Sequence, residues 1–207
     1  DCDQQALLVA MLRGSFEFQG QKCSASSRAY IPKSIWDNIG DDYCAEVAKI
    51  TLGDPRNFSN FMSAVIDRKS FDNITGYIER AKADPGCTIV TGGNYDDSTG
   101  YFIEPTTILC EDSRYESMVE EIFGPVLSIH IYADNDFEDI LAVCDSSSEY
   151  ALTGSIFAKD RRHIETALKA LRYAAGNFYI NDKPTGAVVG QQPFGGARGS
   201  GTNDKAG

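Results

Sequence analysis

Apolar side chains in the first part of the chain recur with the 3.6-residue period of an amphipathic helix. Residues 3–15 show this spacing, and the predicted helix ends in a glycine-bearing loop over residues 14–23. Two further helices are expected. One begins at Ser34, a favourable N-cap, and stops before Gly53, while the other covers residues 63–83.

Beyond the third helix, short apolar runs rich in β-branched residues alternate with helical patterns. The predicted strands are residues 87–91, 106–109, 126–132, 152–158 and 178–181, and the predicted helices are residues 136–145 and 160–172. Strands separated by helices of about ten residues are typical of βαβ units. The sequence therefore predicts one α/β domain with a mainly parallel sheet and helices on both faces.

Composition narrows the possible partners. The 207 residues are 42% hydrophobic and 24% charged, as in ordinary folded domains, and the net charge is −11. An acidic protein repels nucleic-acid phosphates and anionic membranes, so we expect neither as a partner. The longest apolar runs, residues 6–12 and 125–131, fall short of the ~20 residues that cross a bilayer. The first residues contain no signal peptide, and their abrupt start suggests that the natural N-terminus is missing.

The cysteines carry the first hint of chemistry. All are far apart in sequence, which favours free thiols over a disulfide framework or a zinc site. Cys23 differs from the others because it lies among small polar residues after a glycine, whereas most others fall inside helix or strand patterns. Lys22 adds a positive charge that favours the nucleophilic thiolate. A lysine beside a loop cysteine is common, however, and a structural role stays open at this point.

A cysteine hydrolase would need a histidine base, and the chain offers His130 in a strand pattern and His163 on a charged helix face. Neither has a local catalytic signature, so this interpretation is weak. A G-x-G-x-x-G dinucleotide loop is also absent from the sequence. If a nucleotide is used, most of its phosphate binding must come from outside these residues.

Two other segments have the composition of ligand loops. Residues 120–125 read Glu-Glu-Ile-Phe-Gly-Pro, which places a carboxylate at the entrance of a strand, where it can chelate a ribose diol. Residues 186–207 are rich in glycine, as loops at the carboxyl ends of parallel strands often are. When each segment is taken alone, plain strand capping and plain turns explain them better than ligand binding does.

Together these pieces resemble the aldehyde dehydrogenase superfamily. The matching stretches are Phe-Gln-Gly-Gln-Lys-Cys-Ser at 18–24, the Glu-Glu-Ile-Phe-Gly-Pro motif at 120–125, and Pro-Phe-Gly-Gly at 193–196 followed by Ser-Gly at 200–201. More narrowly, residues 63–67, 175–183 and 190–204 are similar to the branch that oxidises L-glutamate-γ-semialdehyde, formed from Δ1-pyrroline-5-carboxylate, to L-glutamate. The resemblance covers essentially the whole chain and implies the fold of the family's catalytic domain.

The resemblance implies a role for each matching residue. Cys23 corresponds to the nucleophile, with its own backbone N–H donating to the oxyanion. Glu121 corresponds to the carboxylate on the nicotinamide ribose of NAD, with Phe123 beside the nicotinamide. The implied substrate-binding residues are Ser24, Gly186 and Ala187 for the α-carboxylate, and Phe194 as an aromatic wall of the aldehyde tunnel. Thiolate attack, hydride transfer to NAD⁺ and hydrolysis of a thioester would follow.

One departure from the family pattern is the length of the chain. The resemblance implies a larger N-terminal part with the NAD-binding fold, a transition-state asparagine and the general-base glutamate, and also a C-terminal tail in the subunit interface. We therefore expect residues 1–207 to be the cysteine-bearing catalytic domain of a longer enzyme, inactive alone. That enzyme is expected to be a homo-oligomer of the mitochondrial matrix or cytoplasm, without a metal. A different aldehyde substrate, or a non-catalytic binding module, remains the alternative.

Overall fold

The computed structural model describes residues 1–188 and 190–205. The helices are α1 Gln4–Phe16, the 3₁₀ helix η1 Glu17–Gly20, α2 Lys33–Val47, α3 Arg68–Ala83, α4 Glu116–Val119, α5 Phe137–Ser146 and α6 Arg161–Ala170. The strands are β1 Arg28–Pro32, β2 Cys87–Thr91, β3 Tyr95–Asp96, β4 Phe102–Ile103, β5 Thr106–Cys110, β6 Val126–Tyr132, β7 Tyr150–Ala151, β8 Thr153–Ile156, β9 Asn177–Ile180 and β10 Ala197–Arg198.

The main sheet has four strands in the order β1-β6-β5-β2. Both β1 and β5 run parallel to β6, and β2 pairs antiparallel with β5. A separate two-stranded sheet joins β8 and β9 in parallel. The prediction of a mainly parallel sheet is thus confirmed, although the described residues form it as a four-stranded sheet with β8 and β9 apart.

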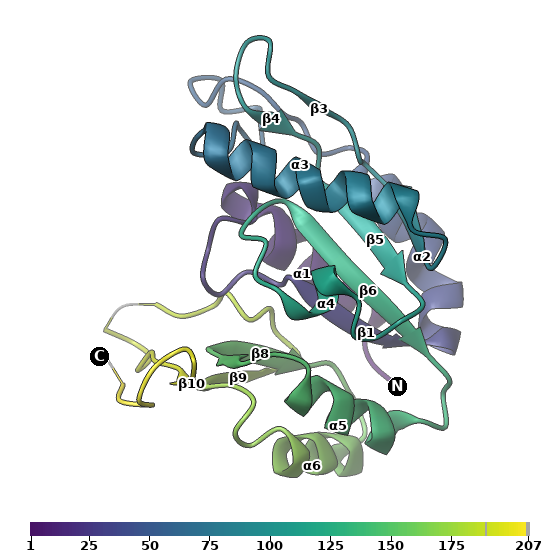
Figure 1. The fold of residues 1–207 in the computed structure, drawn as a ribbon. Coiled ribbons are helices and arrows are strands. Elements are labelled where there is room, and N and C mark those ends of the chain that lie inside the picture. Colours follow the sequence, from purple (N-terminus) through teal and green to yellow (C-terminus); the bar gives the residue numbers. More distant parts are fainter. Residues whose placement is uncertain (189, 206–207) are drawn as a thin grey trace.

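Helices cover both faces of the main sheet, as predicted (Figure 1). On one face α3 packs over Ile108 and Val126, and on the other α1 and α2 pack over Leu127 and Ile129. Val126 and Leu127 are adjacent in β6 and point to opposite faces because side chains alternate along a strand. Their full burial explains why β6 reads as a nearly continuous apolar run.

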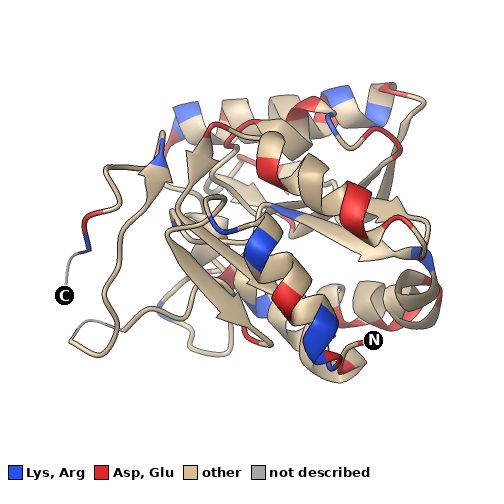
Figure 2. Ribbon diagram, turned by 90° about the horizontal axis from the view of Figure 1, so that it is seen from below, with Lys and Arg blue, Asp and Glu red and all other residues tan. Residues whose placement is uncertain are grey.

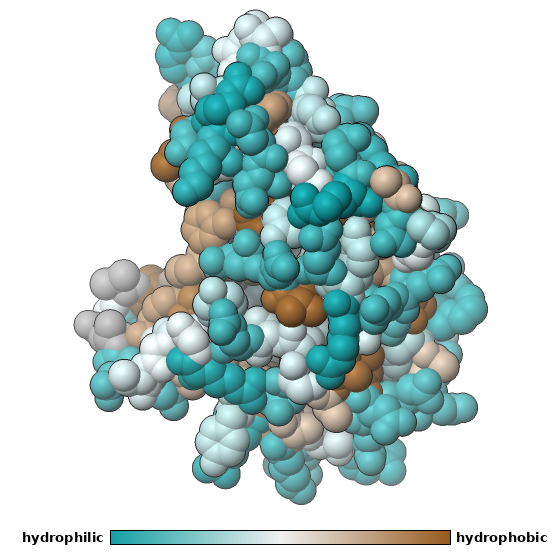
Figure 3. Space-filling model, in the orientation of Figure 1, coloured by the Kyte–Doolittle hydropathy of each residue, from teal (hydrophilic) through white to brown (hydrophobic). Residues whose placement is uncertain are grey.

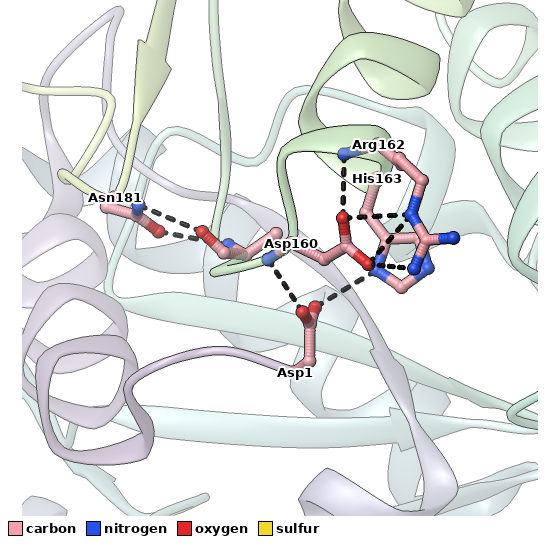
Figure 4. A network of polar contacts seen from close by, with 6 residues as sticks. Asp1, Asp160, Arg162, His163 and Asn181 are labelled. Atoms are coloured by element: carbon pink, nitrogen blue, oxygen red, sulfur yellow. Dashed lines mark hydrogen bonds and ion pairs between the residues drawn. The ribbon is translucent and has the colours of Figure 1, made fainter.

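A smaller layer contains α5 and α6 together with β8 and β9. Leu141, Ala167 and Leu171 form its own small apolar cluster. Asp1 anchors the chain's first residue to this layer (Figure 4): its carboxylate accepts from the Asp160 N–H at 2.7 Å and contacts Nδ1 of His163 at 3.1 Å. The first and last thirds of the sequence are therefore joined at the start of α6.

Several predicted boundaries were wrong for identifiable reasons. The helix expected over residues 63–83 begins at Arg68, because Asp67 is the N-cap and accepts from the Ser70 N–H at 2.7 Å. The expected N-cap Ser34 lies inside α2, and its hydroxyl donates to Asp134 at 2.6 Å. The loop expected from residue 14 begins later, since α1 continues to Phe16.

Charge and hydropathy are spread over the surface. Acidic and basic positions are both present along outer helices such as α3 and α6 (Figure 2), and several form ion pairs within one helix, such as Arg161 with Glu165. Apolar groups reach the surface as separate patches among hydrophilic ones (Figure 3). Within the described ranges, none of the helices combines the length and apolar character required to cross a membrane.

Candidate active site

Cys23 lies in a tight turn between η1 and β1. The turn is closed by the Ala25 N–H, which donates to the Lys22 carbonyl at 3.0 Å. The thiol is exposed, and the other cysteines of the chain are partly or fully buried. Among the described residues the backbone N–H groups of Cys23 and Ser24 have no hydrogen-bond acceptor. An accessible thiol beside unused donors is the arrangement that stabilises an oxyanion formed on the thiol's own substrate.

The backbone just before this turn has an unusual conformation. Phe18, Gln19 and Gly20 all have positive φ angles, at 56°, 59° and 64°. Only glycine adopts this region without steric cost, so strain is concentrated beside the thiol. A Cβ on Gly20 would overlap the carbonyl oxygen of Gly124 and lie 2.8 Å from the Ser15 carbonyl oxygen. Glycine is required here because the cysteine loop packs directly against the 120–125 motif.

Two glutamines fix the loop to a third segment. Gln19 donates through Nε2 to the Ala64 carbonyl at 3.1 Å, and Gln21 accepts from the Ile66 N–H at 2.9 Å. Ile66 and Phe18 themselves remain 79% and 65% exposed, and Phe123 is 45% exposed. Large apolar side chains on or near the cysteine loop and in the 120–125 motif are therefore not covered by described residues, which is typical of a surface that meets a ligand or another domain.

Glu17 is the centre of an ion cluster beneath the loop. Its carboxylate contacts Arg13 at 2.6 Å, Lys22 at 3.0 Å and Lys183 at 3.7 Å. Burial opposes ionisation of Glu17, but hydrogen bonds and charges from these cations outweigh it, so the pKa of the carboxyl is lowered. The Lys22 ammonium is thus paired with Glu17, and the expected role of Lys22 in favouring a Cys23 thiolate is not what its contacts indicate.

The adjacent carboxylates of the second motif have different environments. Glu120 accepts a short hydrogen bond from the Tyr77 hydroxyl of α3, and this bond raises the pKa of Tyr77 to about 12. Glu121 is exposed and has no hydrogen-bond or ion-pair partner in the described part of the chain. An anchored carboxylate therefore lies next to a free one, and the free one is available to a polar ligand.

A cavity of about 550 Å³ lies beside the thiol. Its walls come from the edge strand β1 on one side and from β8 on the other, and Cys23, Glu121 and Lys183 also line it. β1 ends the main sheet and β8 pairs with β9 alone, so each has an edge without a strand partner among the described residues. The lining exposes more apolar than polar surface, so the cavity suits an apolar occupant along much of its length.

The remaining predicted site residues are less closely gathered. Ser24 is half-buried beside Cys23, and Lys183 connects the segment before Gly186 to the Glu17 cluster. Ala187 is exposed, and Phe194 is half-buried and does not line the cavity. Residues 189, 206 and 207 of the glycine-rich stretch lie outside the described residues. The structure thus brings Cys23 and Glu121 to one cavity, and the predicted site residues that do not line it are Ser24, Phe123, Gly186, Ala187 and Phe194.

The other candidate nucleophile and base pairs do not form. His130 donates through Nδ1 to the Cys110 carbonyl at 3.0 Å, and His163 contacts Asp1. Neither imidazole is hydrogen-bonded to Cys23 among the described residues, so the arrangement of a cysteine hydrolase is not observed. Burial raises the pKa of each of the other five thiols, which are Cys2, Cys44, Cys87, Cys110 and Cys144.

Sequence reasoning missed Glu17 and Tyr77 as parts of this site. Glu17 looks like an ordinary helix-surface residue, and its cation Lys183 is far away in sequence. Tyr77 follows the apolar pattern of α3 and gives no sign of its hydrogen bond to Glu120. The only available signal was the position of Glu17 four residues after Arg13, which indicates a local ion pair and no more.

Comparisons with known proteins agree with this geometry. The sequence profile of the aldehyde dehydrogenase family matches residues 1–207. A mitochondrial Δ1-pyrroline-5-carboxylate dehydrogenase from Dictyostelium discoideum is 62% identical over 196 residues, covering 95% of this chain and 35% of the relative. The human mitochondrial enzyme of that name is 50% identical, covering 99% of this chain and 37% of its own length.

Solved structures give the same result. The crystal structure of the Δ-pyrroline-5-carboxylate dehydrogenase from Mycobacterium tuberculosis bound with NAD superposes with a TM-score of 0.91 at 52% identity, covering 100% of this chain and 37% of that one. The chain therefore spans little more than a third of the length of the relatives it matches.

Proposed function

The chain belongs to the aldehyde dehydrogenase family, and from this premise we propose that it is the cysteine-bearing catalytic part of an NAD-dependent dehydrogenase that oxidises L-glutamate-γ-semialdehyde to L-glutamate. One observation carries the proposal: the exposed thiol of Cys23 and the free carboxylate of Glu121 line one cavity. The contact between Gly20 and Gly124 holds their two loops together. The names of the relatives support the substrate assignment.

In this proposal Cys23 is the nucleophile. Its sulfur bonds to the aldehyde carbon, and the carbonyl oxygen becomes an oxyanion that the unused N–H groups of Cys23 and Ser24 stabilise. Loss of hydride from that carbon leaves a thioester, and water releases the acid. Because the donors are fixed by the closed turn, they need no rearrangement when the charge forms.

NAD supplies the hydride acceptor when it is bound. Glu121 fits the ribose because its carboxylate is exposed and has no partner among the described residues. Phe123 has a φ of 57° and is 45% exposed, which presents its ring to a planar ligand. Tyr77 holds Glu120 and so leaves Glu121 as the carboxylate that meets the cofactor.

The substrate's α-carboxylate is assigned to Ser24, Gly186 and Ala187, and an aromatic wall to Phe194. The ion pair of Lys183 with Glu17 supports the assignment of the 186–187 segment, because it joins that segment to the cysteine loop. Neutral backbone donors suit a carboxylate, since hydrogen bonds to a charged acceptor are strong without a second charge to desolvate. Phe194 rests on the family resemblance alone.

The rest of the enzyme is proposed to supply the NAD-binding domain and the general base. The edges of β1 and β8 that have no strand partner among the described residues support the presence of further chain beside them. The exposed side chains of Phe18, Ile66 and Phe123 support a domain or ligand that covers them. A homo-oligomer of the mitochondrial matrix or cytoplasm is proposed from the family and from the mitochondrial relatives.

The test is NADH formation from Δ1-pyrroline-5-carboxylate by the full-length enzyme, by its Cys23→Ala variant, by a Cys44→Ala control, and by residues 1–207 alone. We expect turnover only from the wild type and the control. Turnover by residues 1–207 would disprove the assignment of the base and cofactor domain elsewhere. A preference for apolar aldehydes would disprove the substrate, and equal thiol reactivity with and without Cys23 would favour a binding module.

A further inference from the structure

Two cysteines that the proposed reaction does not use lie opposite each other on neighbouring strands of the main sheet. Cys87 in β2 and Cys110 in β5 are directly paired in the antiparallel register. The next pair along the two strands is Gly86 and Glu111. It is a hydrogen-bonded pair, because the Glu111 N–H donates to the Gly86 carbonyl at 2.9 Å. Because such pairs alternate along an antiparallel ladder, Cys87 and Cys110 occupy a non-hydrogen-bonded position.

This position has the geometry of a disulfide. Opposed Cα atoms at non-hydrogen-bonded positions lie about 4.5 Å apart, which falls inside the roughly 4.4–6.8 Å that a disulfide spans. Both side chains point to the face covered by α3, since both pack in the same apolar cluster. No backbone movement is therefore needed to bring the sulfurs together.

The two thiols differ in accessibility. Cys87 is half-buried in the edge strand β2, whereas Cys110 is 3% exposed. Burial raises the pKa of both, that of Cys110 to about 12, and each thiol also acts on the pKa of the other through a side-chain hydrogen bond. An oxidant therefore reaches Cys87 first, and Cys110 is placed to react with whatever forms there.

The pair also supports the segment that leads to the candidate site. Sγ of Cys110 lies 3.7 Å from Oγ of Ser117 in α4, and Ser128 donates to the same Ser117 oxygen at 2.7 Å. The pKa of Tyr115, the N-cap residue of α4, is raised first by burial and then by the charge and hydrogen bond of Cys87. Helix α4 ends at Val119, directly before Glu120 and Glu121.

We propose that Cys87 and Cys110 form a reversible cross-strand disulfide under peroxide. Peroxide oxidises the Cys87 thiol to a sulfenic acid and releases one water. The Cys110 thiol then attacks that sulfur, an S–S bond forms, and the sulfenic oxygen leaves as a second water. Two thiols are oxidised and one peroxide is reduced, and a dithiol reductant reverses the bond.

A consequence for the site follows, which rests on the proposed function. Once bonded to Cys87, Sγ of Cys110 turns away from Ser117, and α4 loses one of its contacts with β5. The carboxylates of Glu120 and Glu121 follow α4 without an intervening residue. The oxidised enzyme is therefore expected to require more NAD for half-saturation than the reduced enzyme.

The primary test is peptide mapping of the full-length protein after peroxide treatment, in a Cys23→Ala background that removes the exposed thiol. We expect a cross-linked peptide that joins Cys87 to Cys110, disappears with dithiothreitol, and forms faster at pH 8.5 than at pH 7 because both thiols must ionise. Cys44→Ser is the matched control and keeps the cross-link, whereas Cys87→Ser loses it.

Cys110→Ser changes a buried side chain and can fail to fold, so the half-buried Cys87→Ser variant carries the decision. Over-oxidation of Cys87 without a cross-link, or no change at either cysteine, would overturn the proposal. The functional consequence is measured separately, by titrating NAD binding to the Cys23→Ala enzyme before and after oxidation and after reduction. If the cross-link forms and the NAD requirement is unchanged, the disulfide proposal stands and only its expected effect on Glu121 is disproved.

Discussion

The cysteine loop, residues 17–27, and the first part of the glycine-rich stretch, of which residues 186–188 and 190–192 are described, both carry predicted site residues, yet they are fixed in opposite ways. The cysteine loop contacts α1, the 64–66 segment, Gly124 and Lys183, which are spread over the whole chain. Among the described residues of this stretch, the backbone N–H groups of Gln191 and Gln192 donate to the Val188 carbonyl, and a side-chain bond joins Gln192 to Tyr179. The Cys23 thiol is therefore positioned by contacts that reach across this chain, whereas the described residues of the glycine-rich stretch are held mainly by local turns.

The substitution Gly20→Ala is expected to have the largest effect, because it disturbs the contacts that fix the cysteine loop. The new Cβ overlaps the Gly124 carbonyl oxygen and forces a φ of 64° on a residue with a side chain. Overpacking against backbone together with left-handed strain is expected to lower the free energy of unfolding by about 3 kcal/mol or more. Urea unfolding of the full-length protein measures the loss, and stability equal to wild type would mean that the two loops do not touch.

Glu17→Gln tests the ion cluster beneath the loop. Removing one partner of a hydrogen-bonded charge cluster is expected to cost about 1–2 kcal/mol at neutral pH, discounted for partial solvent screening. The pKa of Glu17 is lowered in the folded protein, so its contribution is present above the ordinary carboxyl pKa and disappears as pH falls through the lowered value.

The measurement for Glu17 is the difference in unfolding free energy between wild type and Glu17→Gln from pH 7 to pH 3. The difference is expected to shrink towards zero as pH falls, since the wild-type carboxylate then becomes protonated. A difference that stays constant with pH would show that packing, not charge, is what the substitution removes.

Tyr77→Phe separates the anchored carboxylate from the free one. Loss of the hydrogen bond to Glu120 is expected to lower stability by about 1 kcal/mol and to raise the NAD concentration needed for half-saturation, because Glu120 then competes with Glu121 for the same space. A spectrophotometric titration checks the cause: the variant should lose a tyrosine that ionises near pH 12. Tyr173→Phe, at an exposed tyrosine that does not line the cavity, is the control.

Gly190→Ala is expected to have the smallest effect on stability and tests the glycine-rich stretch in the same way as Gly20→Ala tests the cysteine loop. Gly190 has a φ of 77°, like Gly20, but a Cβ there would meet no atom within 4 Å. Only backbone strain remains, partly offset by lower entropy of the unfolded chain, so a loss of about 0.5–1 kcal/mol is expected. Losses of equal size at Gly20 and Gly190 would show that conformation, rather than the contact with Gly124, explains the requirement for glycine.

The sequence by itself determined the elements with strong local patterns and the chemistry-bearing motifs. Strand β2 and strand β6 have the predicted bounds, and α5, α6 and β9 lie within a few residues of them, because apolar periods and β-branched runs are local properties. The family can also be identified from short motifs, because the order and spacing of the segments around Cys23 and Glu121 are read directly from the sequence.

Only the tertiary structure decided which distant residues meet. Strand β1 has no strong local pattern and forms because Arg28–Pro32 pairs with Ser128–Tyr132. The Gly20 contact with Gly124 and the Glu17 ion pair with Lys183 join residues more than a hundred positions apart. Such contacts arise from packing of whole elements around the sheet, which no local period encodes, and they bring the thiol of Cys23 and the carboxylate of Glu121 to one cavity.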